Sequence, residues 1–233
     1  MENDRPDADQ ILWTPSDQDI DRSRLFAFMS ANDIDDFDTL MDRSTADVAW
    51  FTDALIRFLG IRFTVPYERS VDLDPTDWKR PVWCPGGRMN ITASCLDRWI
   101  EDEDTAQRLA LIAELEDGQI REFSYAELAA QVSRCANGLR ELGLGVGDRI
   151  GLYLPMTWQN AVALLAIARI GGIALPLFSG FGTGAVQQRL EDAEAQALIT
   201  ADGFHRRGKV VPLKPQADAA VDDVPSLDHQ IVV

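Results

Sequence analysis

The chain has 233 residues, of which 46% are hydrophobic and 26% charged, and its formal net charge is −16 at pH 7. This length and composition predict a globular protein of one or two domains with a substantial core. The strong acidity argues against a nucleic-acid partner, because phosphates require a basic face, and against docking on an anionic membrane.

The cysteines Cys84, Cys95 and Cys135 form no C-x-x-C pair and predict neither a disulfide framework nor a metal site. Free thiols of this kind are the default in a reducing cytosol, so we expect a cytoplasmic protein. The first ten residues contain neither a basic stretch nor an apolar run, so no secretory signal is expected. The most apolar run, residues 161–178, is interrupted by an arginine, glycines and a proline and predicts a helix and a strand rather than a membrane span.

Residues 1–105 are expected to form a segment of helices and extended chain that begins with an arm around Trp13. Amphipathic patterns predict helices over residues 24–33, 44–60 and 91–103, and prolines predict a loop over residues 61–90. Thr45 is expected to cap the longest of these helices, and Gly60 to end it.

Residues 106–233 have a different pattern, which predicts an α/β domain with a mostly parallel sheet flanked by helices. Asp117-Gly118 lies between two strand-like runs and predicts a β-hairpin. Ser124 and Glu127 form a capping-box pattern at the start of a helix. Apolar runs then alternate with helical patterns, which is typical of βαβ units. The expected strands are 149–155, 173–178, 197–200 and 230–233, and the expected helices are 124–143, 157–171 and 184–195. A strand at the last residue suggests a chain that is cut short.

The segment GFHRRGK, residues 203–209, nearly matches the phosphate loop G-x-x-x-x-G-K-[ST]. Val210 takes the place of the hydroxyl that would bind magnesium. Pro212 argues against the helix whose N-terminal amides would face the phosphates. We therefore expect no mononucleotide phosphate loop here.

A second glycine pattern, Gly180, Gly182 and Ala185, matches G-x-G-x-x-A after a predicted strand, and Asp202 follows about 20 residues later. This context is that of a dinucleotide-binding fingerprint. The alternative is a generic turn between strand and helix, which needs small residues for steric reasons alone.

Arg206, Arg207 and Lys209 form a basic cluster in an acidic protein, in a predicted loop after a strand. The carboxyl edge of a parallel sheet is where α/β proteins bind ligands, and arginine offers a planar fork to phosphate. Phe178 and Phe181 flank the neighbouring turn and add apolar surface. These loops are expected to form a pocket for a phosphorylated nucleotide; the alternative is a solvated basic loop.

The run from FSYAELAAQV to GGIALPLF, residues 123–178, resembles the N-terminal subdomain of AMP-forming acyl-CoA synthetases, in the acyl-adenylating superfamily. Residues 83–102 are similar to a segment of the acetyl-CoA synthetase branch, and LWTPS, residues 12–16, resembles acetoacetyl-CoA synthetases. LITADGFHRRGKVVPLK, residues 198–214, is similar to the acetyl-CoA synthetase segment that contributes to coenzyme A binding. The resemblance extends over residues 10–233.

The resemblance implies an acid–thiol ligase that uses ATP, Mg²⁺ and coenzyme A. In such enzymes a short carboxylic acid attacks the α-phosphate of ATP and gives an acyl-adenylate and diphosphate. The thiol of coenzyme A then displaces AMP and forms the acyl-CoA. A basic loop holds the 3′-phosphate and adenine end of coenzyme A.

By position, the resemblance places Arg206 and Lys209 in the two basic places of that loop. It assigns the partial coenzyme A site to Arg206, Arg207, Gly208, Lys209, Phe178, Ser179 and Gly180. Ser179 stands where the family usually has glycine, and Lys209 where it has arginine. Because lysine is a point charge without the fork of arginine, a weaker hold on the phosphate is expected.

The family's Ser/Thr/Gly-rich adenylation loop, its acid- and AMP-binding segments, its hinge and its catalytic lysine lie farther downstream, and none occurs in these 233 residues. We therefore expect no catalytic residue in this chain, no adenylation by it alone, and ATP and Mg²⁺ binding only in a complete enzyme. His205 and His229 are expected to be solvated loop residues, because catalysis needs an oriented partner.

Other functions remain open. The chain could be a non-catalytic remnant, or a subunit that docks on a complementary C-terminal chain carrying the catalytic parts. It could also be a dinucleotide-binding module that uses Gly180, Gly182 and Asp202.

Overall fold

The computed structural model describes residues 13–74, 79–116 and 118–233. The chain forms two compact units, one ending at Arg88 and the other beginning at Met89, and each has its own core. The division into residues 1–105 and 106–233 stays a prediction, since it rests on sequence segments rather than on contacts. Most of the predicted N-terminal arm, and Asp117 of the predicted hairpin, lie outside the described residues.

The first unit is helical. Its helices are α1 (Asp17–Asp21), α2 (Arg24–Ser30), α3 (Phe37–Ala46) and α4 (Val48–Leu59). The buried ring of Phe28 lies at the centre of their core, where it packs edge-on against Phe51 and Phe58. Edge-to-face packing of this kind adds to the free energy gained by apolar burial.

The prediction of one helix over residues 44–60 is wrong at its start, because α3 ends at Ala46 and α4 begins at Val48, with Asp47 between them. The Asp47 carboxylate accepts a hydrogen bond of 2.8 Å from the Trp50 N–H and caps α4. Thr45 does not cap, since its hydroxyl donates to the Met41 carbonyl at 2.8 Å within α3. Gly60 ends α4 in the left-handed conformation (φ 63°), as predicted.

Residues 61–74 and 79–88 are mostly irregular, as the prolines of this segment predicted. The predicted loop nevertheless contains a short antiparallel pair, β1 (Val71–Asp72) and β2 (Val82–Trp83). The Tyr67 hydroxyl donates a 2.7 Å hydrogen bond to the carboxylate of Asp53 and so ties this segment to α4.

The second unit starts with α5 (Ile91–Cys95), the 3₁₀ turn η1 (Asp97–Trp99) and α6 (Glu103–Ala106), so the helix predicted over 91–103 is a series of short pieces. Polar contacts hold them to the rest of the unit. The Asn90 amide donates to the Ala168 carbonyl at 2.9 Å. The Arg169 guanidinium pairs with Asp97 and donates to the Ser133 hydroxyl.

The hairpin predicted around Asp117-Gly118 is formed by β3 (Leu109–Glu114) and β4 (Ile120–Ser124), which pair antiparallel. Helix α7 (Tyr125–Glu141) follows it directly. The predicted capping box is present: Ser124 accepts from the Glu127 N–H, and the Glu127 carboxylate accepts from the Ser124 N–H.

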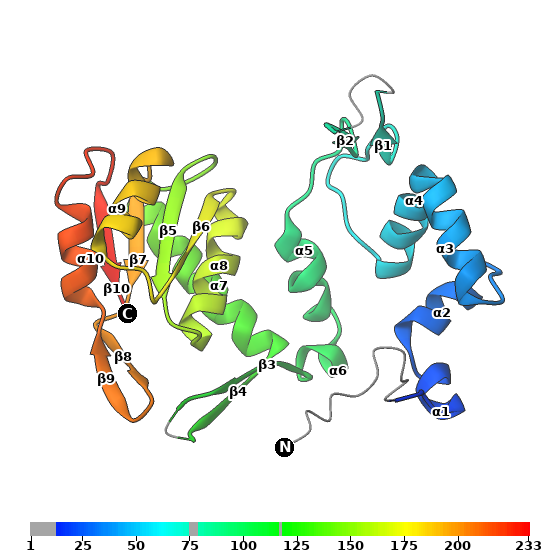
Figure 1. Ribbon diagram of the computed structural model, residues 1–233, viewed down its shortest axis with the longest axis horizontal. Helices are drawn as coiled ribbons and strands as arrows, with labels where there is room; N and C mark the ends of the chain where they lie inside the picture. Colours follow the sequence, from blue (N-terminus) through cyan, green and yellow to red (C-terminus); the bar gives the residue numbers. More distant parts are fainter. Residues whose placement is uncertain (1–12, 75–78, 117) are drawn as a thin grey trace, which may run out of the picture. The chain divides into compact units, whose positions relative to one another are not determined.

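A parallel sheet of β5 (Arg149–Leu154), β6 (Ile173–Phe178), β7 (Ala197–Thr200) and β10 (His229–Val232) forms the core of this unit, in the order β10-β7-β5-β6. The connections contain α8 (Trp158–Ile170), α9 (Thr183–Asp192) and α10 (Lys214–Val221). Figure 1 shows α7 and α8 on one face of the sheet and α9 and α10 on the other. The predicted α/β class, with a parallel sheet flanked by helices, is confirmed.

Close packing in the sheet requires a glycine at Gly151 of β5. A Cβ at this position would lie 2.8 Å from methyl carbons of both Leu190 and Leu198. Strands lie on both sides of β5, because β6 joins one edge and β7 the other. The carboxyl ends of β5 and β7 therefore mark the point where the strand order reverses, which is where open α/β sheets bind ligands.

A second hairpin, β8 (Gly203–Arg206) and β9 (Lys209–Pro212), projects between β7 and α10. Among the helices of the described residues, none combines the length and the hydrophobicity that a bilayer crossing requires.

Candidate functional site

A cavity of about 500 Å³ lies at the carboxyl ends of the parallel strands. Residues that follow each strand contribute to its wall, namely Pro155 after β5, Ser179 after β6, Asp202 after β7 and Val233 after β10. The carboxyl ends of β5 and β7, between which the strand order reverses, therefore contribute to the wall. The cavity occupies the position at which this class of sheet places ligands.

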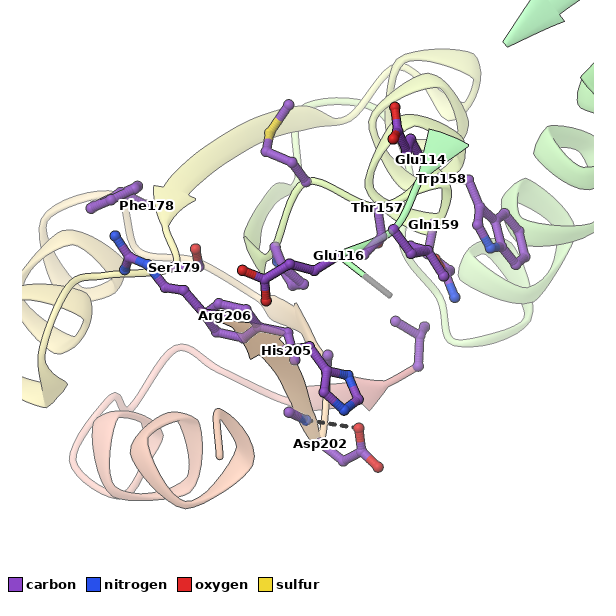
Figure 2. Close-up of a pocket in the computed structure, with 17 residues that line it drawn as sticks. Glu114, Glu116, Thr157, Trp158, Gln159, Phe178, Ser179, Asp202, His205 and Arg206 are labelled. Carbon is purple, nitrogen blue, oxygen red and sulfur yellow. Dashed lines mark hydrogen bonds between the residues drawn. The ribbon is translucent and has the colours of Figure 1, made fainter. Parts of the chain in front are cut away.

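The two sides of the cavity differ in chemistry. Figure 2 shows Phe178, Ser179 and Arg206 gathered on one side, and Trp158 and Gln159 at the start of α8 on the other. The first side thus combines a cation with an aromatic ring, and the carboxylate of Glu116 lies beside the cation. An arrangement of this kind suits a ligand that has both a negative charge and a planar base.

The basic segment is a hairpin rather than the loop that the sequence predicted. Arg207 and Gly208 form its two-residue turn with φ values of 52° and 71°, the positive values that type I′ turns require. The register places Arg206 directly opposite Lys209, so the two cations share one face of the hairpin. Like charges opposite each other in a strand pair are destabilising, and a bound anion would relieve that cost.

The turn after β6 presents an aromatic ring to the cavity. Phe178 is 61% exposed, and its ring packs edge-on against Phe181 with the centroids 5.6 Å apart. Gly180 leaves space for this ring, because a Cβ there would lie 2.4 Å from Phe178 Cε1. The glycine is therefore required by the position of the aromatic side chain.

The structure brings three of the predicted site residues to the cavity wall: Phe178, Ser179 and Arg206. The remaining four act on these three or lie beside them. Gly180 supports the Phe178 ring, Lys209 pairs with Arg206 across the hairpin, and Arg207 and Gly208 make the turn.

Two residues that the sequence reasoning missed also shape the site. Glu116, at the tip of the β3–β4 hairpin, accepts a hydrogen bond from the backbone N–H of Arg207. The buried Tyr153 of β5 donates through its hydroxyl to the Phe181 carbonyl at 2.6 Å. A carboxylate in a turn and a tyrosine in an apolar strand carry no local signal for these long-range contacts.

The other two motifs of the sequence have different outcomes. As predicted, no helix directly follows Lys209: this residue is the first of strand β9, so the segment does not have the geometry of a phosphate loop. The dinucleotide-binding interpretation is contradicted by topology. Gly180 follows β6 and Asp202 follows β7, and β5 lies between these strands, whereas a dinucleotide-binding unit places them side by side.

Both histidines lie in strands rather than in the predicted loops. His205 is an exposed residue of β8 on the cavity wall. His229 belongs to β10, and its Nε2 lies 3.0 Å from the Leu142 carbonyl oxygen. His229 therefore has a structural partner at the end of α7.

The comparisons of this chain with known proteins agree on one family. Residues 98–233 match the family model described as AMP-binding enzyme. The chain is 43% identical over 159 residues to acetyl-coenzyme A synthetase of Deinococcus radiodurans, covering 67% of this chain and 24% of that protein. It is 38% identical over 199 residues to the enzyme of the same name from Laribacter hongkongensis, covering 84% and 30% respectively.

A solved structure shares the fold. Acetoacetyl-CoA synthetase from Streptomyces lividans aligns with a TM-score of 0.85 and 28% sequence identity, over 96% of this chain and 35% of that one. The chain thus spans between about a quarter and a third of the length of these three proteins.

Proposed function

Because the chain belongs to the AMP-binding enzyme family, we propose that it is the N-terminal portion of an ATP-dependent acyl-CoA ligase of the acetyl-CoA synthetase type. The complete enzyme joins a short carboxylic acid to coenzyme A and converts ATP to AMP and diphosphate. In this proposal ATP and Mg²⁺ bind only in the complete enzyme. This chain contributes part of the coenzyme A site and is inactive alone.

The observation that carries the proposal is the pairing of Arg206 with Lys209 on one face of the hairpin, next to the exposed ring of Phe178. The two cations supply the charge that the 3′-phosphate of coenzyme A needs, and Arg206 supplies a fork of donors. The ring of Phe178 offers a stacking surface to adenine. Ser179 also lines the cavity, on the same side as Phe178 and Arg206.

Isothermal titration calorimetry with coenzyme A and with its dephospho form tests this site. We expect the chain to bind coenzyme A more tightly, and Arg206→Gln to lose about tenfold in affinity for coenzyme A because a charged hydrogen bond is removed. Arg140→Gln is the charge-matched control, since Arg140 lies in the last turn of α7 and contacts Asn137. Equal and negligible heats for both ligands would refute the proposed site.

Substitutions at Arg207 in the turn and at Lys209 in β9 test which cations of the hairpin contact the phosphate. Arg207→Asn keeps a residue that tolerates positive φ and removes a charge that does not line the cavity. Its Kd for coenzyme A should change less than that of Arg206→Gln. Lys209→Arg should tighten binding, because it restores a fork to the second basic position.

The absence of adenylation by the chain alone is tested by diphosphate release from ATP with acetate, propionate, butyrate and acetoacetate. We expect none with any of these acids. Release above the background of a heat-inactivated sample would show that the chain carries adenylation chemistry of its own.

A docking role is the second candidate, and a specific surface favours it. An apolar groove of about 470 Å³ lies between α7, α8 and the sheet, and is lined by Cys135, Leu139, Leu142, Val162, Ala163, Ile199, Ile231 and Val233 among others. It borders β10, an edge strand of the sheet. The opposite edge strand, β6, contains Pro176, which has no N–H to offer a further strand. We propose that a chain carrying the remainder of the synthetase fold covers the groove and extends the sheet at β10.

Mixing the chain with the downstream part of the Deinococcus radiodurans enzyme tests docking by analytical size exclusion. Leu142→Lys should abolish the complex, because Leu142 lines the groove and is 41% exposed, so the substitution does not disturb the core. Val146→Lys is the control, since Val146 is 88% exposed and outside the groove. Equal effects of the two substitutions would exclude the groove as the docking surface.

A further inference from the structure

The two loops that form the proposed coenzyme A site are joined through one buried side chain. Tyr153 of β5 is fully buried, and its hydroxyl donates to the Phe181 carbonyl at 2.6 Å. The same hydroxyl lies 3.3 Å from Oε1 of Gln216 in α10. Tyr153 does not line the cavity itself.

Each contact of Tyr153 leads to one of the loops. The Phe181 N–H donates to the Phe178 carbonyl at 2.9 Å, so Phe181 closes the turn that presents the aromatic ring. Gln216 Nε2 donates to the carbonyl of Pro212 at 3.4 Å, and Pro212 is the last residue of the basic hairpin. A chain of polar contacts therefore runs from the aromatic turn, through Tyr153 and Gln216, to the base of the hairpin, with the single hydroxyl proton of Tyr153 shared unequally between the near Phe181 carbonyl and the more distant Gln216 Oε1.

We infer that Tyr153 is a positioning residue that fixes the aromatic turn against the basic hairpin, so that one nucleotide contacts both. The inference rests on the proposed function, because the ligand in question is coenzyme A. A nucleotide with a base and a 3′-phosphate is held best when Phe178 and Arg206 keep a constant separation. Less conformational entropy is then lost when the ligand binds, because the two loops are already ordered. Burial raises the pKa of Tyr153, so the hydroxyl stays protonated and remains a donor at neutral pH.

Substitution Tyr153→Phe removes the donor and retains the ring, so the core keeps its volume. We expect the Kd for coenzyme A to rise about fivefold, in line with the loss of one buried hydrogen bond. The Kd for dephospho-coenzyme A should rise less, because that ligand does not need both loops at once. The affinity ratio of the two ligands should thus fall, which a general loss of stability would not produce.

Amide hydrogen exchange without ligand gives an independent reading. In Tyr153→Phe we expect faster exchange at the amides of residues 178–182 and 203–212, and unchanged exchange in α7 and α8. Tyr67→Phe is the matched control: it also removes a tyrosine hydroxyl with a 2.7 Å hydrogen bond, but in the other unit, and should leave these loops unchanged.

The outcomes separate the two proposals. If the wild-type chain binds coenzyme A and Tyr153→Phe alters neither the affinity ratio nor the exchange of the loops, the positioning role is refuted and the proposed site stands. If the wild-type chain binds no coenzyme A, the proposed site fails, and unchanged exchange in Tyr153→Phe would refute the link between the loops as well. Faster exchange at both loops supports the link in either case.

Discussion

The backbone N–H of Arg207 donates a hydrogen bond to the carboxylate of Glu116, which lies 91 residues earlier in the chain. The tips of two hairpins are thereby joined, and a negative charge is placed beside the basic cluster. Glu116→Gln keeps an oxygen that accepts this hydrogen bond and removes the charge. We expect the Kd for coenzyme A to fall about threefold at low salt, since the charge would otherwise repel the phosphate.

Glu122→Gln is the control for this prediction, because Glu122 is an exposed residue of the same hairpin that does not line the cavity. Calorimetry at low and high salt separates the two effects, since screening should erase a gain that comes from charge. Weaker binding by Glu116→Gln would show that the carboxylate contributes by holding the hairpin in place.

Gly180→Ala should weaken coenzyme A binding while the fold remains intact. The new Cβ would lie 2.4 Å from the ring of Phe178, and that ring is 61% exposed and free to swing away. Loss of the stacking surface should raise the Kd about tenfold. Gly184→Ala is the matched control, because no atom lies within 4 Å of its Cβ and alanine favours α9. Equal Kd values for wild type and Gly180→Ala would exclude a role for the ring.

Gly151→Ala should destabilise the α/β unit. Its Cβ would lie 2.8 Å from methyl carbons of Leu190 and Leu198, both fully buried, so the core cannot yield without repacking. We expect a loss of about 1–3 kcal/mol in the free energy of unfolding, measured in urea. Gly145→Ala, whose Cβ meets no atom within 4 Å, should change it by less than about 0.5 kcal/mol.

Tyr67 should make stability depend on pH in the alkaline range. Its hydrogen bond to Asp53 raises its pKa from 10.0 to about 12 in the folded protein. Below pH 10 both states keep the proton and the contribution is complete. Between pH 10 and 12 the unfolded state releases the proton first, so the contribution is lost as the pH rises.

Urea unfolding of wild type and Tyr67→Phe at a series of alkaline pH values tests whether the contribution of Tyr67 to stability decreases as the pH rises. The difference in unfolding free energy should shrink as the pH approaches 12. Tyrosinate absorbance should also lose a phase near pH 12 in Tyr67→Phe. A difference that grows with pH would contradict the assignment.

Sequence patterns predicted the α/β unit well where local and long-range preferences agree. The capping box of Ser124 and Glu127 forms as expected, and the predicted strands and helices form in the predicted order, whereas helix α10 was not predicted. The predicted start of one helix in the first unit was wrong, because a different residue caps it. Asp47 divides the helix predicted over 44–60, because its carboxylate is a better cap than the hydroxyl of Thr45, which turns back to α3.

The basic hairpin escaped prediction for a physical reason. Type I′ turns are signalled by Asn-Gly or Asp-Gly, and here Arg207 takes the first position with φ 52°. The general location of the site was predictable, since carboxyl ends of parallel strands meet at one edge. The contacts of Tyr153 and Glu116 were not, because they join residues 28 and 91 positions apart in the chain.

The two-residue turn of this hairpin limits the insertions and deletions that the segment tolerates. Arg206 and Lys209 face the same way only because two residues separate them. An insertion or deletion of one residue would send one of the cations to the opposite surface, even if every side chain were retained. Variation in this segment should therefore preserve the count of residues between the cations more strictly than their identity, and a randomised library with fixed spacing should retain function where a length-varied one does not.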